Sequence, residues 1–537
     1  MRSMEPERQD AQAGRGMIRG FADIGVGTLV SRLSGFAREV VTAAFFGAGT
    51  AMDIFVAAFT IPNLLCRVLG ESAVESGFMP LFKGTHARGE TGRAWALAGR
   101  TTNALALTLL AVVVAGIAAA PLLVRIVAHG FEGEVARETV RMTRLMFPFG
   151  LAIGMAALMG AILLAFGRYR VYSLAPVLLN VGIVGSVLAL AGRLSYTSLA
   201  IGVLVGGALQ FLVQVPFVRA IAKSDGEALF RRGLNPGDRD LGEVGKLTGP
   251  VVLASAIQRV GVIVDRTIAS FLVPGSISSL YYSFRLVHLP YAILALAAGR
   301  SAAPVLAESY ALGKHDEFRR TFVSGFRMNL AYLAPVVILS VWFARPVVGL
   351  VYQRGAFDET DLAMTASAFA LYSLGLVGMG IVFLLVRAFA ARLNTRTPVK
   401  VSVAAFLLNV ALNLILVRTP LRHAGLALAT SITFTVHAVV LHVILNRDMA
   451  AHGEPIAPSD LLRPGSKIAL SSAALLAVLW LADGALGMRL AGSQAVGRLV
   501  RIAAVGGAGA AAYTAVAALL RVPEIAGLLG GRRRSAK

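Results

Sequence analysis

The sequence predicts an all-α polytopic membrane protein with about 14 transmembrane helices. Of its 537 residues, 56% are hydrophobic and only 15% are charged, and the mean hydropathy is +0.72. Soluble domains have a much lower apolar share. Long charge-free windows recur, and they are continuous rather than alternating, so they favour helices over the strands of a β-barrel.

Nine windows are long and free of charge. A helix needs roughly 20 apolar residues to cross about 30 Å of hydrocarbon, and most of these windows are close to that length. They are Ala104–Val124, Leu145–Gly167, Val171–Gly192, Leu194–Val218, Met328–Ala344, Ala363–Val386, Val401–Val417, Ala424–Asn446 and Ile502–Leu520.

Five further apolar segments are interrupted by charged residues. We count them as spans because charges inside a span normally face a polar interior and mark a pathway. They cover residues 20–46, 51–80, 248–273, 280–309 and 466–488.

The spans group into two lobes of six helices around a central cavity, followed by two C-terminal helices. The longest polar loop separates the two lobes. A weak internal repeat supports this division, because the segment APVLLNV at Ala175–Val181 resembles two segments of the second lobe, Pro398–Val399 (PV) and Leu407–Val410 (LLNV). Repeated halves are common in secondary transporters, although Pro and Leu-Leu-Asn also recur by chance in Leu-rich helices. The expected segments are 1–19 (N-terminal, cytoplasmic), 20–221 (first lobe), 222–246 (inter-lobe loop), 247–447 (second lobe), 448–520 (C-terminal helix pair) and 521–537 (basic tail).

Lys and Arg residues predict the orientation. With the N-terminus in the cytoplasm, the cytoplasmic segments hold roughly 30 of the 51 Lys and Arg residues, as the positive-inside rule requires. Both termini are then cytoplasmic. The net charge of +22 and the tail Gly531–Lys537 favour contact with anionic membrane lipids over nucleic acid.

The interrupted spans carry the candidate site. A charge at the centre of a span costs at least about 2.5–3.5 kcal/mol, so these residues are candidates for a polar pathway. Arg67 and Glu71 are four residues apart and share a helix face, and Pro62 predicts a bend in the same span. The candidate substrate-cavity residues are Arg32, Arg38, Asp53, Arg67, Glu71 and Arg285.

Several arginines converging on one cavity suit a phosphorylated substrate, because guanidinium binds phosphate oxygens in a bidentate way. Two simpler interpretations stay open. Arg38, Glu39 and Arg300 are also suited to snorkelling at span ends, and Arg67 with Glu71 to an internal ion pair.

Asp265 suggests a second kind of site. With Asn409 and Asn413, which are four residues apart, its carboxylate would form a candidate coupling-ion site for Na⁺ or, with a shifted pKa, for H⁺. The simpler alternative is that the adjacent Arg266 neutralises it.

The sequence contains no pattern of enzymatic chemistry. There is no Walker A motif and no nucleophile paired with a base, and the single cysteine, Cys66, excludes a multi-cysteine metal site. His288, His437 and His442 lack metal-ligand spacing and suit the core or the interface. We therefore expect neither a cofactor nor a metal. We expect that transport is coupled to Na⁺, to H⁺ or to the membrane potential.

The charged spans also resemble a known family. The stretch 31–80, SRLSGFAREVVTAAFFGAGTAMDIFVAAFTIPNLLCRVLGESAVESGFMP, is similar to the N-terminal signature of the MurJ/MviN family. Further similar segments are GSISSLYYSFRL at 275–286, GKHDEF at 313–318 and NTRTPVK at 394–400, so the resemblance covers nearly the whole chain.

The resemblance implies a lipid II flippase of the multidrug/oligosaccharidyl-lipid/polysaccharide exporter superfamily in the bacterial plasma membrane. Such a protein moves the undecaprenyl-pyrophosphate-linked peptidoglycan precursor from the inner to the outer leaflet, for cell wall biosynthesis. It also implies that Arg32, Arg38, Asp53 and Arg285 line the central cavity, and that the two C-terminal helices help to form a groove for the lipid tail.

The sequence departs from the family pattern at several positions. Cys66 stands where family members commonly have an arginine, leaving only Arg67, and Phe284 precedes Arg285 where an aspartate is frequent. Another lipid-linked substrate therefore stays open. The alternatives are a cation-coupled drug or polysaccharide-lipid exporter of the same superfamily and an inactive membrane scaffold that recruits cell-wall synthesis proteins.

Overall fold

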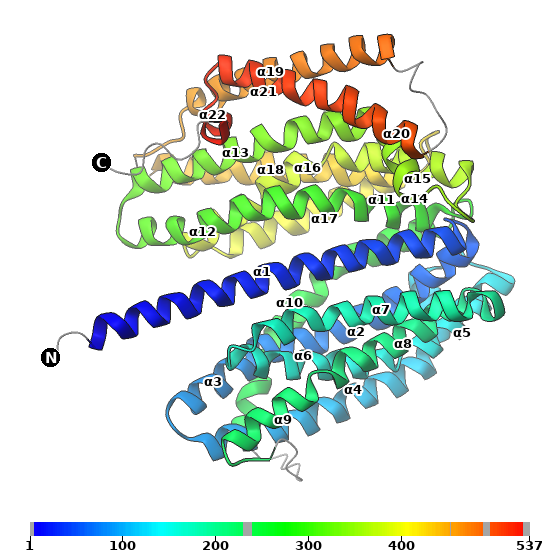
Figure 1. The fold of residues 1–537 in the computed structure, drawn as a ribbon, viewed down its shortest axis with the longest axis vertical. Coiled ribbons are helices and arrows are strands. Elements are labelled where there is room, and N and C mark those ends of the chain that lie inside the picture. The colour runs from blue at the N-terminus through cyan, green and yellow to red at the C-terminus, as the bar shows by residue number, and fades with distance from the viewer. Residues whose placement is uncertain (1–4, 229–238, 452, 487–494, 530–537) are drawn as a thin grey trace. The chain divides into compact units, whose positions relative to one another are not determined.

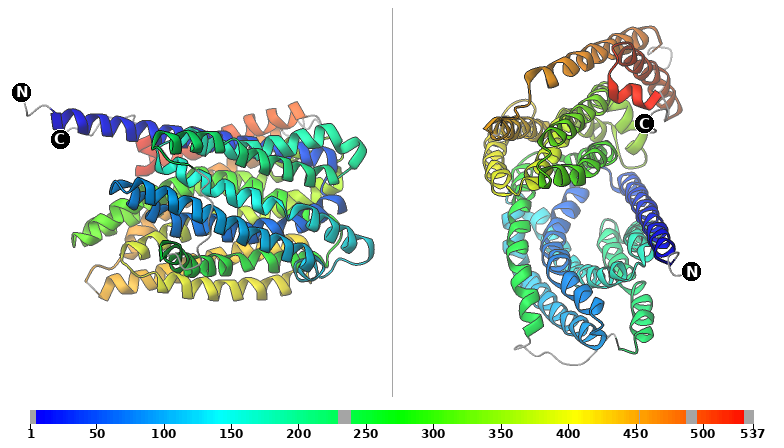
Figure 2. Two further views of the ribbon diagram at one scale, coloured as in Figure 1. Left: turned by 90° about the horizontal axis from the view of Figure 1, so that it is seen from below. Right: turned by 90° about the vertical axis from the view of Figure 1, so that its left-hand side faces the viewer.

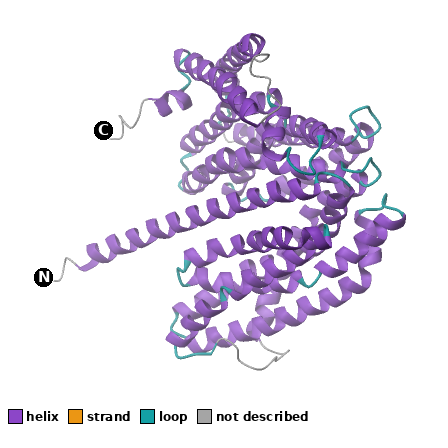
Figure 3. Ribbon diagram, turned by 45° about the vertical axis from the view of Figure 1, so that its right-hand side comes forward, coloured by secondary structure: helices purple, strands orange, loops and turns teal. Residues whose placement is uncertain are grey.

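The computed structural model describes residues 5–228, 239–451, 453–486 and 495–529, and within these ranges it consists of helices and loops without strands (Figures 1 and 3). This confirms the predicted all-α class. The chain divides into two compact units, Met1–Pro274 and Gly275–Lys537.

The helices of the first unit follow the predicted spans in order. They are α1 (Glu5–Phe46), α2 (Thr50–Ala73), the π-helix η1 (Val74–Phe78), α3 (Met79–Ala87), α4 (Thr91–Val127), α5 (Gly133–Met146), α6 (Phe149–Ala165), α7 (Tyr169–Leu194), α8 (Thr197–Leu212), α9 (Val215–Ser224) and α10 (Arg239–Ala269).

The second unit contains the remaining helices. They are α11 (Ser276–Pro290), the π-helix η2 (Tyr291–Ala295), α12 (Leu296–Ala311), α13 (His315–Trp342), α14 (Ala344–Tyr352), α15 (Glu359–Ser373), α16 (Leu376–Ala391), α17 (Arg396–Leu416), α18 (His423–Ala451), α19 (Pro458–Leu486), α20 (Ala495–Arg501), the π-helix η3 (Ile502–Gly506), α21 (Gly507–Leu519) and α22 (Pro523–Leu529).

By length and composition, 10 of the described helices are suited to cross a membrane, or up to 12 if two bent pairs each count as one span. The bent pairs are Ser276–Ala295 with Ala298–Ala311 and Glu359–Ser373 with Leu376–Ala391. The predicted spans at 20–46 and 248–273 are helical, in α1 and α10, but they do not belong to this set. The count of 14 therefore stays a prediction.

The order of elements repeats in the two units. Each unit contains a π-helix between two α-helices near its start. In the first unit η1 lies between α2 and α3, and in the second unit η2 lies between α11 and α12. A left-handed glycine then precedes the next long helix, Gly89 (φ +82°) before α4 and Gly313 (φ +67°) before α13. This correspondence supports the internal repeat expected from the sequence.

Each unit also contains an aspartate whose hydrogen-bond donor contacts an aromatic ring. In the first unit, the Trp95 indole N–H donates to Asp225 Oδ2 at 2.8 Å and its ring stacks on Phe166. In the second unit, Arg392 donates to Asp448 Oδ2 at 3.0 Å and lies over the Tyr310 ring.

α10 belongs to the second lobe by sequence order, as the first helix after the 222–246 loop. In the structure it packs against α2, η1 and α4 of the first unit. Packing thus divides the chain after Pro274, whereas the repeat begins anew at α10. The expected lobe boundaries at 221, 247 and 447 stay a prediction.

α19 and α21 pack against each other, and α19 also packs on α13. Figure 2 shows these helices from two further directions. The short α22 returns to α13 as well, where Arg327 Nε donates to Glu524 Oε1 at 2.8 Å. Tyr332 donates to the Glu524 carbonyl at 3.1 Å, and Tyr513 donates to the Ala331 carbonyl at 2.7 Å. These contacts attach the end of the described chain to the second unit.

Candidate functional site

A polar cluster joins α1 to α7 in the first unit. Arg38 donates from Nη1 to Asn180 Oδ1 at 3.1 Å and forms an ion pair with Glu39. Asn180 in turn donates to Ser34 Oγ at 2.9 Å. Because Glu39 and Asn180 are buried, the Arg38 charge is balanced inside the protein rather than by snorkelling to water.

Arg32 has a different environment although it lies on the same helix. It is half-buried and lines a cavity of about 360 Å³ within the first unit. In the described part of the chain it forms no hydrogen bond or ion pair within the protein. It is therefore the cavity arginine whose charge is available to a bound anion.

The cavity lies among α1, α6, α7 and the junction of α8 and α9. Its polar wall contains Gln210 and Gln214, and Gln214 donates from Nε2 to the Gln210 carbonyl at 2.8 Å. Its apolar wall is made mostly of small α6 residues such as Ala156 and Ala161. A guanidinium, two amides and an apolar wall are suited to a ligand that is anionic at one place and polar beside it.

Asp53 and Arg67 lie on α2, where the sequence places them. Asp53 is buried in the first helical turn, where the helix dipole favours a negative charge, and Arg67 is half-buried. Both already have interaction partners. The side chains of Cys66 and Glu71 lie outside the described residues, so the predicted ion pair of Arg67 with Glu71 is not tested.

Arg285 belongs to the second unit and is exposed. Its guanidinium lies 5.0 Å from the ring centroid of Tyr281, one turn earlier on α11, and Nη2 is 3.4 Å from the Tyr281 hydroxyl. A cation–π contact orients an arginine without neutralising it. The ring therefore restricts the orientation of Arg285, which also has a further interaction partner.

The candidate coupling-ion residues are divided between the units. Asp265 lies half-buried on α10 of the first unit and has interaction partners. On α17 of the second unit, Asn413 donates to Asn409 Oδ1 at 3.2 Å, as their spacing predicts, and Asn409 donates to Thr433 at 3.4 Å. The described residues contain no group of three His, Cys, Asp or Glu side chains arranged for a metal ion.

The three histidines considered above pack among apolar or aromatic groups. His288 contacts the rings of Phe284 and Tyr291, and His442 lies against Phe322. His437 is buried on α18. These surroundings agree with the expected core or interfacial role.

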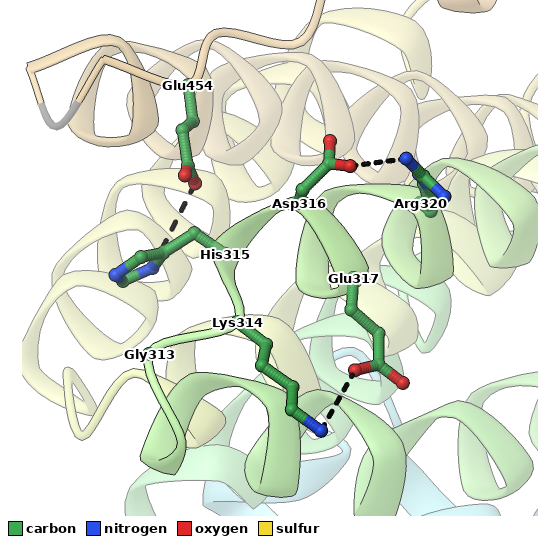
Figure 4. A pocket seen from close by; sticks show the side chains of 7 residues that line it. All are labelled: Gly313, Lys314, His315, Asp316, Glu317, Arg320 and Glu454. Carbon is green, nitrogen blue, oxygen red and sulfur yellow. Dashed lines mark hydrogen bonds and ion pairs between the residues drawn. The ribbon is translucent and has the colours of Figure 1, made fainter.

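A second cavity, of about 620 Å³, opens at the start of α13 (Figure 4). Its charged side chains are already paired with one another: Lys314 with Glu317 at 3.9 Å, His315 with Glu454 at 3.9 Å and Arg320 with Asp316 at 2.5 Å. Such mutual pairing is typical of a solvated helix start. We therefore do not assign this cavity to the substrate.

Sequence reasoning missed the neutral polar residues of the first unit. It selected charges inside apolar spans and passed over Asn180, Gln210 and Gln214, although each is a polar residue within or next to an apolar window. The four-residue spacing of Gln210 and Gln214 is the available signal, since it places both amides on one helix face.

Comparisons with known proteins agree on one family. The family model described as "Lipid II flippase MurJ" matches residues 42–491. The chain is 34% identical to the lipid II flippase MurJ of Burkholderia cenocepacia over 433 residues, covering 78% of this chain and 82% of the relative. It is 29% identical to the probable lipid II flippase MurJ of Haemophilus influenzae over 432 residues, covering 77% and 83%.

Solved structures show the same fold. A lipid II flippase MurJ in an inward closed conformation matches with a TM-score of 0.78 and 22% identity, covering 94% of this chain and 99% of that one. An inward-facing multidrug resistance MATE family transporter of the MOP superfamily matches with a TM-score of 0.67 and 14% identity, covering 80% and 98%.

Proposed function

The chain belongs to the lipid II flippase MurJ family, and we propose that it moves lipid II from the inner to the outer leaflet of the bacterial plasma membrane by alternating access. The family match over residues 42–491 carries this conclusion. The undecaprenyl tail stays in the bilayer while the pyrophosphate and sugars pass through a polar cavity. The product supplies peptidoglycan synthesis outside the membrane.

The charges of the structure support an anionic cargo. Arg32 is available in a cavity of the first unit, and Arg285 is oriented by the Tyr281 ring in the second. A charged side chain inside a membrane protein is costly unless it is paired or serves a pathway. Arg32, which has no ion-pair partner in the described part of the chain, is therefore suited to a pyrophosphate group.

A cation-coupled drug exporter is the second candidate, because MATE transporters share the fold. A cavity for cationic drugs would present acidic and aromatic residues, whereas this one presents Arg32. The charge of the cavity therefore favours the flippase. The proposed activity is transport rather than catalysis. In this proposal both termini lie in the cytoplasm, and the basic segments contact anionic membrane lipids.

The energy source is a further part of the proposal. Coupling to Na⁺, H⁺ or the membrane potential would supply the directional bias that a flippase needs. Asp265 with Asn409 and Asn413 is the candidate ion site. Replacing the Na⁺ gradient in reconstituted vesicles by K⁺, with and without a protonophore, distinguishes the three sources.

Complementation tests the function. A bacterium depleted of its own lipid II flippase should grow when it expresses this chain, but not when it expresses Arg32→Ala or Arg285→Ala at equal membrane levels. Arg320→Ala is the matched control, since Arg320 is exposed and paired with Asp316 at the start of α13, and it should rescue growth. Growth supported by both Arg32→Ala and Arg285→Ala would contradict the arginine assignment.

Cys66→Arg tests the departure from the family pattern. If the native chain fails to support growth while Cys66→Arg restores it, the natural cargo is a different lipid-linked molecule. If both support growth, the missing arginine is dispensable for lipid II.

A further inference from the structure

Arg259 places a positive charge inside a predicted membrane span. It lies on α10, within the span expected at 248–273, and its side chain is half-buried. In the part of the chain that the structure describes, no hydrogen bond or ion pair involves this side chain. An intramembrane charge is costly, and such residues normally pair with another charge or face the path of a substrate or ion. Arg259 is therefore a candidate for contact with the cargo.

Contacts near both ends of α10 give the depth of Arg259 in the span. Near one end, Arg93 donates to Asp240 Oδ1 at 2.7 Å, and near the other, Thr267 donates to the Ile126 carbonyl at 2.8 Å. Arg259 precedes Thr267 by eight residues, which is about 12 Å along a helix that rises 1.5 Å per residue. The charge therefore lies within the span and not at its ends, where snorkelling is usual.

Arg259 shares a helix face with residues that pack on α2 and η1 (Figure 1). It precedes Ile263 by about one turn and follows Thr248 by about three turns, so the three share one side of α10. Thr248 lies against η1, because a Cβ on Gly77 would lie 2.3 Å from its Oγ1. Ile263 packs on a buried cluster that contains Ile61 of α2. Arg259 therefore lies on the α2 side of α10, between these two contacts.

The same contacts give the depth of Arg259 relative to α2. They show that the two helices run in opposite directions, so one turn back from Ile263 on α10 corresponds to one turn forward on α2. Leu65 packs on the same cluster as Ile263, and the turn that follows Leu65 begins with Cys66. Arg259 is therefore at the depth of Cys66, the position where this sequence lacks the arginine of the family pattern.

We propose that Arg259 binds phosphate oxygens of the cargo and supplies from α10 the guanidinium that Cys66 does not supply from α2. A guanidinium is suited to this role because it binds phosphate through two parallel hydrogen bonds. The inference rests on the proposed function and deepens it, because it adds a residue of α10 to those that contact a lipid-linked pyrophosphate. It also accounts for an anion pathway in a chain that has cysteine at position 66.

Binding to the full chain in lipid nanodiscs tests the assignment. The probe is radiolabelled farnesyl pyrophosphate, measured by equilibrium dialysis with empty nanodiscs as the background. Arg259→Gln should lose at least about tenfold in affinity, because a hydrogen bond to a charged group is lost. Arg259→Lys keeps the charge without the paired hydrogen bonds and should have an intermediate affinity. Arg239→Gln is the matched control, since Arg239 is exposed at the start of the same helix, and it should bind as the native chain does.

Cys66→Arg tests the shared depth. In the Arg259→Gln background it should restore most of the lost affinity, and the two changes should be non-additive because both side chains reach one group. Absence of restoration would overturn the assignment of Arg259 to the phosphate that position 66 faces. Native affinity in Arg259→Gln would overturn the proposal as a whole.

Inorganic pyrophosphate distinguishes a membrane source of the ligand from a soluble one. At equal concentration it should displace little of the farnesyl probe, because it has no chain to place in the bilayer. Complete displacement would overturn a lipid-linked ligand at Arg259.

Stability separates binding from folding. Since Arg259 has no protein partner to lose in the described residues, Arg259→Gln should unfold at or above the native temperature in detergent. A lower unfolding temperature together with weaker binding would assign Arg259 a structural role and overturn the proposal.

Flipping of fluorescent lipid II, measured in liposomes with the same preparations, keeps the two proposals apart. Arg259-dependent binding of the probe without flipping by the native chain would keep the Arg259 assignment and reject lipid II as the cargo. Flipping at the native rate by Arg259→Gln, with unchanged affinity for the probe, would keep the function and reject the assignment.

Discussion

Arg38 on α1 donates a hydrogen bond to Asn180 on α7 at 3.1 Å, across 142 residues of sequence. The same asparagine donates to Ser34, one turn before Arg38. Interhelical hydrogen bonds contribute to association inside a membrane, where apolar side chains gain little by leaving lipid. This contact is one of the polar links between α1 and α7, together with the Arg170–Asp23 ion pair at 2.8 Å.

Asn180→Leu should weaken the attachment of α1. The change removes the acceptor of Arg38 and the donor to Ser34, and we expect a loss of about 1–3 kcal/mol because a partly buried guanidinium loses a bond. Thermal unfolding in detergent measures it. Asn409→Leu, at the corresponding position of the internal repeat, removes the 3.4 Å contact with Thr433 and the 3.2 Å bond accepted from Asn413, and it should cost less because neither partner is charged. Equal losses would contradict a special role for Asn180.

Gly206→Ala should destabilise the contact between α7 and α8. A Cβ at Gly206 would lie 2.6 Å from the Leu179 carbonyl oxygen, and because the obstacle is backbone, the helices must separate. The matched control is Gly185→Ala on α7, where nothing lies within 4 Å of the added carbon. The control should be neutral or stabilising by up to about 1 kcal/mol, since alanine favours helix. Unfolding midpoints of the two variants should therefore move in opposite directions.

Glu524→Gln should loosen the end of the described chain. The Glu524 side chain is only 5% exposed and accepts from Arg327 at 2.8 Å, so its neutralisation leaves a half-buried guanidinium without its ion-pair partner. Amide hydrogen exchange at residues 523–529 should rise while exchange in α4 stays constant. Unchanged protection of α22 would mean that apolar packing of Val522 and Ile525 holds it.

Acid should release the first turn of α10. The Arg93 guanidinium binds Asp240 through two bonds, at 2.7 and 3.1 Å, and holds the pKa of that carboxyl below its usual value. Arg93, and then Arg88, likewise lowers the pKa of Glu90. Because folding depresses these pKa values, their stabilisation is present above the unfolded-state value near 4 and is lost as the pH falls through the folded-state values.

Hydrogen-exchange protection factors at residues 239–246 measure this effect. They should fall as the pH is lowered below about 4, the unfolded-state value, and the fall should shrink at high salt because the pair is exposed. Asp240→Asn should show low protection at every pH. A pH-dependent loss that persists in Asp240→Asn would assign the effect to another group.

The sequence by itself determined that the protein is a membrane protein and that its fold is all-α. Charge-free windows as long as Ala104–Val124 can satisfy their backbone in lipid only as helices, and the described part of each predicted span is mostly helical. The resemblance in 31–80 also placed the chain in its family, since it rests on the order and spacing of many residues. Local patterns of this kind do not depend on which helices meet.

Only the tertiary structure decided which charges are balanced. Arg32 and Arg38 lie six residues apart on one helix and are equivalent candidates in the sequence, yet Asn180 and Glu39 bind Arg38 while Arg32 lines an open cavity. Charge pairing and burial depend on neighbours that are distant in sequence, and helix periodicity carries no information about those neighbours.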